Sequence, residues 1–478
     1  MAIKTAKTQS GIVRGIPGRN PDFTVFKGVP YAEPPVGELR FAPARPRTPW
    51  EGEYLCDRFS PAPIQEIPSP DPNVVGEISE DCLYLNIWTP AEAPEEKLPV
   101  MFWTYGGGFQ TGDGAAPETD GEAFNAKGVI LVTYNYRLGA LGYLALPELY
   151  ERYGTSGNIG LLDQIAALRW VKQNIAAFGG DPDNITIFGF SAGGMSTRML
   201  MCSPLTRGLF ARVICESGSG ITDSDYYRPL PEKLEICREG MEKLGWTTED
   251  LMTRDPAEIN AKLQEATVDS LEFWEKSVFQ PNIDGFALLE TPGVTIWKGL
   301  APDVPVISGS VSGDMGWIRI VQDDIKDKDM IPAFKFSRGV AWAERNLQIG
   351  RKPLYTYHFE RTQPASHFST PKNPTPHGSE IAYVFGTLGL YEGMNEYDDS
   401  LSKLFTAYWT NFAKTGDPNG DGLPEWPAYT EENGRLSLHV TDEGYCTEKL
   451  INSNARQRAI DFVVSHPGVI RSVEGLEQ

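Results

Sequence analysis

Ser191 lies in the pentapeptide Gly189-Phe190-Ser191-Ala192-Gly193, which matches G-x-S-x-G, a pattern that presents a serine hydroxyl for nucleophilic attack. The pattern is common by chance, so the residues around it decide whether the match is meaningful. It directly follows the apolar run 185–188 and precedes a helix-compatible segment at 198–201. A strand, a sharp turn and a helix in this order predict a nucleophile elbow, in which the serine sits in a strained turn. The alternative is a glycine-rich turn with an idle serine.

A serine hydroxyl is a weak nucleophile at neutral pH, so it needs a base and an acid that orients the base. Histidine is the commonest base, and the chain has five: His358, His367, His377, His439 and His466. This small number limits the candidates for the base, although the residue types alone do not show which histidine it is.

A glycine triplet follows the apolar run 100–104, in Tyr105-Gly106-Gly107-Gly108-Phe109. Glycines at the end of a strand leave backbone N–H groups unhindered, so they can donate to an oxygen that becomes negative during the reaction. The N–H of Ala192, at the start of the following helix, is a third candidate donor. The alternative is that the glycine triplet is only a flexible turn. The pentapeptide around Ser191 favours the oxyanion-binding role instead.

Short apolar runs, nearly continuous rather than alternating, predict strands that are covered on both faces. A helix is predicted between the second and third of these, because Leu161, Ile165, Leu168 and Val171 fall on one helical face. Strand, helix and strand at this spacing indicate an α/β fold with a mostly parallel sheet. The predicted strands cover residues 100–104, 129–134, 185–188, 213–215, 304–307 and 354–359.

Two charged stretches interrupt this rhythm, around 221–300 and 321–350. The first contains predicted helices at 232–244 and 255–267. No linker or internal repeat separates them from the rest, so we expect helical insertions that cap the sheet of a single domain over residues 1–478.

The charge balance excludes some classes of partner. With 43 basic and 64 acidic residues, the chain carries a net charge of −21. Nucleic-acid binding needs a basic footprint, and anionic membrane surfaces attract basic segments, so neither partner is expected. The first fifteen residues lack the apolar core of a signal peptide, which predicts a cytoplasmic location. The six cysteines form no zinc pattern, so no metal is expected.

Several segments resemble the type-B carboxylesterases. Residues 178–193 (FGGDPDNITIFGFSAG) are similar to the serine signature of that family, and residues 80–86 (EDCLYLN) to its second signature. Further likeness lies at 27–32, 135–137 and 157–164, and the match runs from about residue 8 to at least residue 430. The nearest branch is that of the para-nitrobenzyl esterases. The resemblance implies an α/β-hydrolase fold, hydrolysis of carboxylic esters and no cofactor.

The resemblance also implies roles for individual residues. Ser191 matches the nucleophile, and Gly107, Gly108 and Ala192 match the oxyanion-hole donors. His377, in His377-Gly378-Ser379-Glu380, resembles the catalytic histidine. Asp314 occupies the offset of the acid after a predicted strand, with Asp284 and Asp303 as competitors. The other histidines are expected in a strand (His358) or in surface loops (His367, His439 and His466).

The chain departs from the family pattern at three places. The acid is Asp where most members have Glu, so His377 or its loop must approach more closely. Phe190 replaces the usual Glu before the serine, which predicts a more apolar pocket. The indole of the choline-binding site is absent near residues 70–73, so a quaternary ammonium substrate is not expected. Cys56 and Cys82 resemble the family's N-terminal disulfide pair, although a reducing compartment would leave them as thiols.

These observations predict a monomeric serine carboxylesterase that acts on small, neutral or apolar esters through an acyl-enzyme on Ser191. A lipase is one alternative, but the insertion around 221–300 is too charged for an apolar lid. A feruloyl or other aromatic-ester hydrolase is another, given Phe190. A non-catalytic adhesion protein on the same fold is a third, disfavoured because every residue type of a catalytic triad is present.

Overall fold

A computed structural model describes residues 2–66, 77–218, 220–221, 227–267, 278–314, 330–363 and 374–448. The chain divides into two compact units. Unit 1 comprises Met1–Ile185, Ser203–Leu209 and Asp225–Leu289, and unit 2 comprises Thr186–Cys202, Phe210–Ser224 and Glu290–Gln478. One long strand, β9 (Gly180–Phe190), begins in unit 1 and ends in unit 2.

The strands of unit 1 are largely antiparallel. In its larger sheet, β3 pairs with β4, β4 with β6 and β6 with β8 in antiparallel fashion, while β7 and β8 are parallel. A small sheet of β1, β2 and β5 lies near the N-terminus. Their bounds are β1 Thr5–Lys7, β2 Ile12–Arg14, β3 Ile16–Pro17, β4 Thr24–Pro30, β5 Glu53–Leu55, β6 Tyr84–Thr89, β7 Leu98–Thr104 and β8 Ile130–Tyr134.

The helices of unit 1 include the predicted central helix and the first insertion. The predicted apolar face of α4 (Ile159–Asn174) is confirmed, because Leu161, Ile165, Leu168 and Val171 are all buried. In the insertion, α6 packs on α8, which also packs on α2. The remaining bounds are α1 Glu122–Asn125, α2 Gly139–Tyr143, α3 Pro147–Tyr153, α6 Leu230–Leu244, α7 Thr248–Thr253, α8 Pro256–Thr267, β11 Arg228–Pro229 and β12 Asn282–Ile283.

The strands of unit 2 are parallel up to the last pair. The order is β9, β10, β13, β14 and β15, with each neighbouring pair parallel, and β16 closes the edge in antiparallel fashion. The carboxyl ends of these parallel strands therefore lie along one edge of the sheet, where α/β folds place their ligands. The bounds are β10 Arg212–Glu216, β13 Val306–Val311, β14 Tyr355–Phe359, β15 Ser437–Val440 and β16 Tyr445–Glu448.

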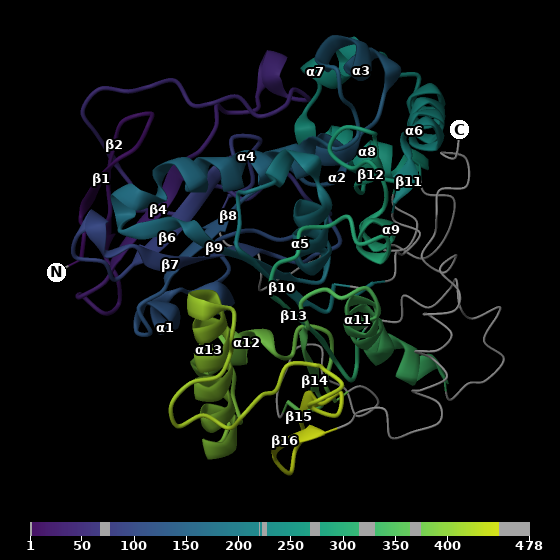
Figure 1. The fold of residues 1–478 in the computed structure, drawn as a ribbon. Coiled ribbons are helices and arrows are strands. Elements are labelled where there is room, and N and C mark those ends of the chain that lie inside the picture. Colours follow the sequence, from purple (N-terminus) through teal and green to yellow (C-terminus); the bar gives the residue numbers. More distant parts are fainter. Residues whose placement is uncertain are drawn as a thin grey trace. The chain divides into compact units, whose positions relative to one another are not determined.

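Helices pack on the strands of unit 2. α5 packs on β10, α11 on β13 and β14, and α12 on α13 (Figure 1). The long helix α13 begins with a capping box at Asn395 and ends at Gly416, which adopts a left-handed conformation. Buried aromatic rings of Tyr357, Phe405 and Trp409 fill the space between α13 and β14. The bounds are α5 Ala192–Cys202, α9 Pro292–Trp297, α11 Met330–Gln348, α12 Ile381–Phe385 and α13 Glu396–Thr415.

The predicted strands are confirmed, with shifts at their ends. β9 begins at Gly180, five residues before its predicted start, and β13 runs on to Val311. The predicted α/β fold with a mostly parallel sheet is confirmed, and the strand pairs β3–β4, β4–β6 and β6–β8 of unit 1 add an antiparallel part that was not predicted. The predicted helices at 232–244 and 255–267 correspond to α6 and α8, and α11 lies in the second insertion. The single domain over residues 1–478 stays a prediction.

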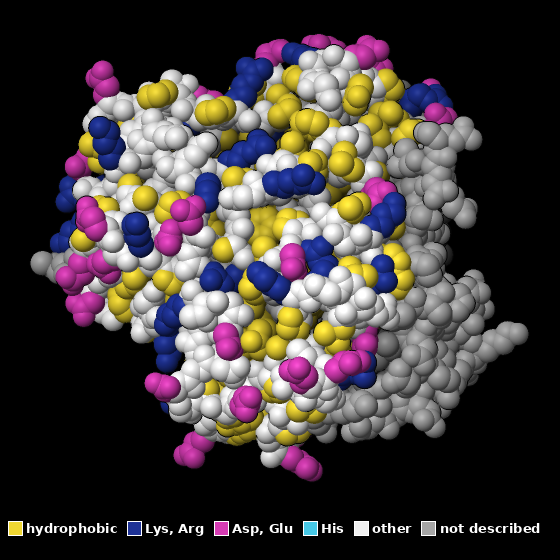
Figure 2. Space-filling view, viewed as in Figure 1, with side chains coloured by type: hydrophobic (Ala, Val, Ile, Leu, Met, Phe, Trp, Pro, Cys, Tyr) yellow, Lys and Arg dark blue, Asp and Glu magenta, His cyan; other side chains and the backbone are white. Residues whose placement is uncertain are grey.

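Charged side chains are dispersed over the surface. Figure 2 shows Asp and Glu side chains at many separate points, with Lys and Arg among them. The net charge of −21 is thus spread out on this face rather than gathered in one patch. Among the described residues, no helix is long and apolar enough to cross a membrane.

Candidate active site

Ser191 occupies a strained position between a strand and a helix of unit 2. It follows β9 directly, Ala192 begins α5, and the backbone φ of Ser191 is 57°. A positive φ is uncommon outside glycine and marks a residue held in place by its surroundings. The Ser191 N–H donates to Glu216 O at 2.9 Å, and its carbonyl accepts from Met195 N at 2.8 Å. This geometry is that of a nucleophile elbow.

The turn requires glycines where α5 approaches β10. A Cβ on Gly194 would lie 2.7 Å from Glu216 O and 2.9 Å from the Gly218 Cα. A Cβ on Gly218 would in turn lie 2.6 Å from the Cys215 Sγ. Real side chains do not tolerate such approaches to backbone, so these glycines allow the helix that begins after Ser191 to sit close to β10.

Asp314 is held by a loop that leaves β13 and is bonded to two other segments. Ser312 N donates to Phe359 O at 2.9 Å, and Gly313 N donates to Thr375 O at 3.0 Å. The Asp314 N–H donates back to Val311 O at 3.3 Å. Asp314 is buried, at 5% exposure. The loop therefore fixes this carboxylate at the carboxyl end of the sheet.

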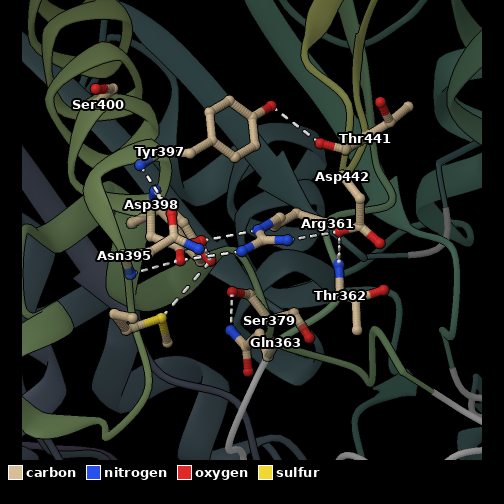
Figure 3. Close-up of polar contacts among 12 residues, drawn as sticks. Arg361, Thr362, Gln363, Ser379, Asn395, Tyr397, Asp398, Ser400, Thr441 and Asp442 are labelled. Carbon is tan, nitrogen blue, oxygen red and sulfur yellow. Dashed lines mark hydrogen bonds and ion pairs between the residues drawn. The ribbon is translucent and has the colours of Figure 1, made fainter.

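The loop that carries His377 is fixed by side chains that follow β14. Gln363 Nε2 donates to Ser379 O at 2.6 Å, as Figure 3 shows, and Thr375 Oγ1 donates to Arg361 O at 3.2 Å. Arg361 is itself anchored by ion pairs with Asp398 and Asp442, each with a shortest distance of 2.8 Å (Figure 3). The histidine loop thus rests on a polar network that is buried at Asp398 of α13 and reaches the more exposed Asp442 after β15.

The structure brings Asp314 and His377 together. Asp314 Oδ1 and His377 Nδ1 form a hydrogen bond, and both side chains are largely buried. Bonding at Nδ1 leaves Nε2 as the nitrogen that can exchange a proton with a substrate or a serine. The two competing acids are engaged elsewhere. Asp284 accepts from Asn158 Nδ2 at 2.8 Å, and Asp303 accepts from Lys352 N at 3.1 Å.

Two other histidines surround a different carboxylate. His358, buried in β14 as predicted, bonds Glu360 through Nε2 at 3.0 Å, and His439 Nε2 lies 2.7 Å from the other Glu360 oxygen. His439 belongs to β15 rather than to the surface loop predicted for it, because residues 437–440 extend the parallel sheet. His367 and His466 lie outside the described residues.

Phe190 faces the histidine of the couple. The two ring centroids of Phe190 and His377 are 5.6 Å apart with an interplanar angle of 42°. Gly378, with φ 85°, allows this contact, since a Cβ there would lie 3.1 Å from the Phe190 ring. An apolar ring therefore stands at the position where the family pattern has a carboxylate.

Sequence reasoning missed two buried carboxyl groups in unit 2, Glu216 and Glu380. Neither has measurable exposure. Burial raises the pKa of Glu216 well above its ordinary value, and the nearby Glu380 raises it further. Burial, followed by the charge of Asp314, raises the pKa of Glu380 to about 7. The available signal was a glutamate directly after a buried strand run and another three residues after His377.

The glycine triplet of unit 1 forms a tight turn after β7. Gly107, Gly108 and Phe109 all have positive φ, of 106°, 63° and 64°. A Cβ on Gly107 would lie 2.1 Å from Thr111 O, so only glycine fits. Gln110 closes the turn through its N–H to Gly107 O at 3.0 Å, while its side chain donates to Phe279 O at 2.6 Å. The turn is thus tied to the first insertion.

Cys56 and Cys82 are both buried as free thiols, so the disulfide that the resemblance implies is not formed in this structure. Burial raises the pKa of the Cys56 thiol to about 12 and also raises the pKa of the Cys82 thiol. Within the described ranges, no group of three or more His, Cys, Asp or Glu side chains is arranged to hold a metal ion.

Comparison with known proteins identifies the family. The sequence profile of the Carboxylesterase family matches residues 3–346 and 328–458. The fumonisin B1 esterase of Sphingopyxis macrogoltabida is 34% identical over 91% of this chain and 86% of its own length. Liver carboxylesterase 1 of Oryctolagus cuniculus is 34% identical over 88% and 86%, respectively.

Solved structures of esterases are similar to this chain as well. A PNB esterase structure superposes with a TM-score of 0.81 at 30% identity, covering 95% of this chain and 99% of its own. The carboxylesterase EST55 of Geobacillus stearothermophilus has a TM-score of 0.79 at 31% identity, over 96% and 100%. The chain therefore belongs to the carboxylesterase family, as a carboxylic ester hydrolase with the α/β-hydrolase fold.

Proposed function

We propose that this protein hydrolyses esters of small, neutral or apolar substrates through an acyl-enzyme on Ser191, with His377 and Asp314 as its catalytic partners. The observation that carries the proposal is the hydrogen-bonded Asp314–His377 couple in the same unit as the strained Ser191 turn. Backbone strain and a buried acid–base pair both cost stability, so folding alone does not explain why the protein contains them.

The proposed reaction has two acyl-transfer steps. Ser191 Oγ attacks the ester carbonyl while His377 Nε2 takes its proton, and Asp314 holds the imidazole in the required tautomer. The N–H groups of Gly107, Gly108 and Ala192 stabilise the oxyanion. His377 then protonates the leaving alcohol, and water repeats the sequence on the acyl-enzyme. No cofactor or metal takes part.

The first insertion supports an esterase over a lipase. Its helices carry charged pairs along their exposed faces rather than an apolar lid surface. Arg238 pairs with Glu235 and Glu242, and Lys262 pairs with Glu265 at 2.8 Å. A lid that opens at a lipid interface needs a broad apolar face, which these ion pairs oppose.

The chemistry around His377 favours uncharged substrates. Phe190 presents an apolar ring beside the imidazole, and an apolar neighbour offers nothing to a cationic or strongly polar acyl group. Esters with aromatic acyl groups are a second candidate on the same observation, since rings stack favourably on phenylalanine.

We further propose a monomer in the cytoplasm. The buried free thiols of Cys56 and Cys82 support a reducing compartment, because such pairs are oxidised in secreted proteins. Alkylation of the purified protein under denaturing conditions, read by mass, tests this directly: six alkylated cysteines are expected, and four would show a disulfide.

The decisive experiment compares Ser191→Ala with Ser400→Ala, a change of an exposed serine on α13 (Figure 3). Ser191→Ala should abolish hydrolysis of a short-chain nitrophenyl ester and labelling by a fluorophosphonate, whereas Ser400→Ala should retain both. Retained labelling in Ser191→Ala would place the nucleophile elsewhere. A wild type that neither labels nor turns over would favour the non-catalytic alternative.

A further inference from the structure

The segment that leads into His377 is bonded to the chains that leave both β13 and β14. On the β13 side, Gly313 N donates to Thr375 O at 3.0 Å. On the β14 side, Gln363 N donates to Pro374 O at 3.2 Å. Because β13 and β14 are parallel neighbours, these bonds hold the segment at the carboxyl edge of the sheet, where the candidate site lies.

Two buried side chains add cross-links on the β14 side. Gln363 Nε2 donates to Ser379 O at 2.6 Å (Figure 3), and Thr375 Oγ1 donates to Arg361 O at 3.2 Å. Gln363 is 6% exposed and Thr375 is 1% exposed, so water competes little for either bond. Gln363 is therefore bonded to the chain both before and after His377.

The backbone that supports these cross-links is itself anchored from α13. Arg361 forms two parallel bonds with Asp398, from Nε to Oδ1 at 2.8 Å and from Nη2 to Oδ2 at 3.1 Å (Figure 3). Asp398 is fully buried and also accepts from the hydroxyl of Tyr383, in α12 just after the histidine loop, at 2.7 Å. A two-bonded Arg–carboxylate pair has a specific geometry, so residues 361–363 form a fixed support.

Between its two anchors the histidine loop makes one tight turn. Ser379 N donates to Pro376 O at 3.1 Å, and Ser379 Oγ donates to the same oxygen at 2.5 Å. The turn determines where the backbone of His377 lies, while the bond to Asp314 sets the rotation of its imidazole. Both are needed to aim Nε2 at a serine hydroxyl or a leaving group, because proton transfer requires hydrogen-bond distance.

We propose that Gln363 is a positioning residue for His377 and that Thr375 assists it, by holding the loop where Nε2 can exchange a proton with Ser191 and the substrate. This inference rests on the proposed function, in which His377 is the general base. Neither side chain takes part in the proton transfers. Their effect on rate follows from placement, since a displacement of about 1 Å at a reacting group costs roughly 100-fold.

Gln363→Met removes the amide donor and keeps a side chain of similar length. We expect kcat for a short-chain nitrophenyl ester to fall about tenfold, as a displacement of less than about 1 Å implies. KM should change by less than about twofold, because the same histidine serves both acyl-transfer steps and both should slow together. Labelling by a fluorophosphonate should slow by a factor similar to that for kcat.

Asn346→Leu is the matched control. Asn346 is buried on α11 and donates to Lys352 O at 2.9 Å, ahead of β14, whereas Gln363 follows the other end of that strand. Each variant removes a buried amide that holds a loop, so both should lower the melting temperature. Only Gln363→Met should lower kcat. A wild-type kcat in Gln363→Met, or equal losses of kcat in the two variants, overturns the proposal.

Thr375→Val takes the place of Gln363→Met if the latter does not fold. The change is close to isosteric and removes only the bond to Arg361 O. We expect kcat to fall about threefold with KM unchanged, as the loss of one neutral hydrogen bond implies. A folded Thr375→Val with wild-type kcat then overturns the proposal.

Proton NMR of the full chain gives a readout that needs no activity. An imidazole N–H bonded to a carboxylate resonates at low field, and loss of the signal in Asp314→Asn would assign it to His377. Release of the loop loosens this bond, so the resonance should shift or broaden in Gln363→Met and stay in place in Asn346→Leu. An unchanged resonance in Gln363→Met overturns the proposal. If the wild type hydrolyses no ester, the proposed function fails, whereas the resonance still decides whether Gln363 holds His377.

Discussion

His377 Nδ1 is hydrogen-bonded to Asp314 Oδ1 although the two residues are 63 positions apart in the chain. Their loops leave neighbouring parallel strands and are bonded to each other through Gly313 N and Thr375 O. The shorter reach of aspartate, compared with the glutamate of most relatives, is therefore met by a direct backbone link between the loops. Asp314 lies close to His377 because the backbones of their two loops are hydrogen-bonded to each other.

Asp314→Asn should nearly abolish ester hydrolysis with little effect on folding. The amide keeps the shape of the carboxylate but favours the wrong imidazole tautomer, which costs roughly 10⁴-fold in kcat in comparable triads. Steady-state kinetics on a short-chain nitrophenyl ester measures the effect. Asp314→Glu is the matched variant: its carboxylate is retained, so it should keep more activity than Asp314→Asn. Equal activities of the two variants would show that this carboxylate does not orient the base.

Phe190→Glu should move the acid limb of the pH–rate profile to higher pH. The ring of Phe190 lies against the imidazole, so a carboxylate at this position would favour the protonated histidine. The base would then be lost at a higher pH than in the wild type, and apolar substrates should bind less tightly. Phe190→Leu, which keeps an apolar side chain, is the control and should leave the limb in place. An unchanged limb in Phe190→Glu would mean that residue 190 does not act on the base.

The strands that lead to the site could be predicted because of how they are buried. β7, β8, β10 and β14 are short apolar runs, and a strand covered on both faces needs no polar alternation. The N-terminal strands β1, β2 and β5 were missed since each has three residues with only one or none of them buried. These segments are strands because β2 pairs with both β1 and β5, and not because of their composition.

The strained serine turn could be predicted from local sequence, whereas the pairing of Asp314 with His377 could not. The elbow depends on residues within one turn, and Ser191 with its positive φ occupies it. The pairing of Asp314 with His377 depends on loops that meet only after the sheet forms, so the five histidines could be separated only by resemblance to a family. Glu216 and Glu380 were missed for the same reason, because each glutamate becomes buried only when β10 and the histidine loop have folded.

Gly309→Ala should destabilise unit 2 and displace Tyr357, whose hydroxyl is bonded to Glu380. A Cβ at Gly309 would lie 2.2 Å from the Tyr357 ring, whose hydroxyl bonds Glu380. Forcing a methyl group into such a packed contact costs roughly 1–3 kcal/mol. Chemical denaturation measures this loss. Gly389→Ala is the control, since nothing lies within 4 Å of a Cβ there, and it should leave the unfolding midpoint almost unchanged. Equal midpoints for the two variants would show that the Tyr357 ring moves aside for the added methyl group without a loss of stability.

Glu360→Gln should remove a source of stability that depends on pH. Hydrogen bonds from His358 and His439 hold the pKa of Glu360 well below its ordinary value. A carboxyl group with a lowered pKa stabilises the folded state above its unfolded pKa, near 4.3, and this contribution is lost as the pH falls toward the folded value. The melting temperature of Glu360→Gln should therefore lie below that of the wild type at pH 7, and the gap should narrow as the solution is acidified below about pH 4. Glu443→Gln, an exposed glutamate in the turn after β15, is the control and should match the wild type across the range. A gap that stays constant with pH would mean that the carboxylate acts through shape alone, without its charge.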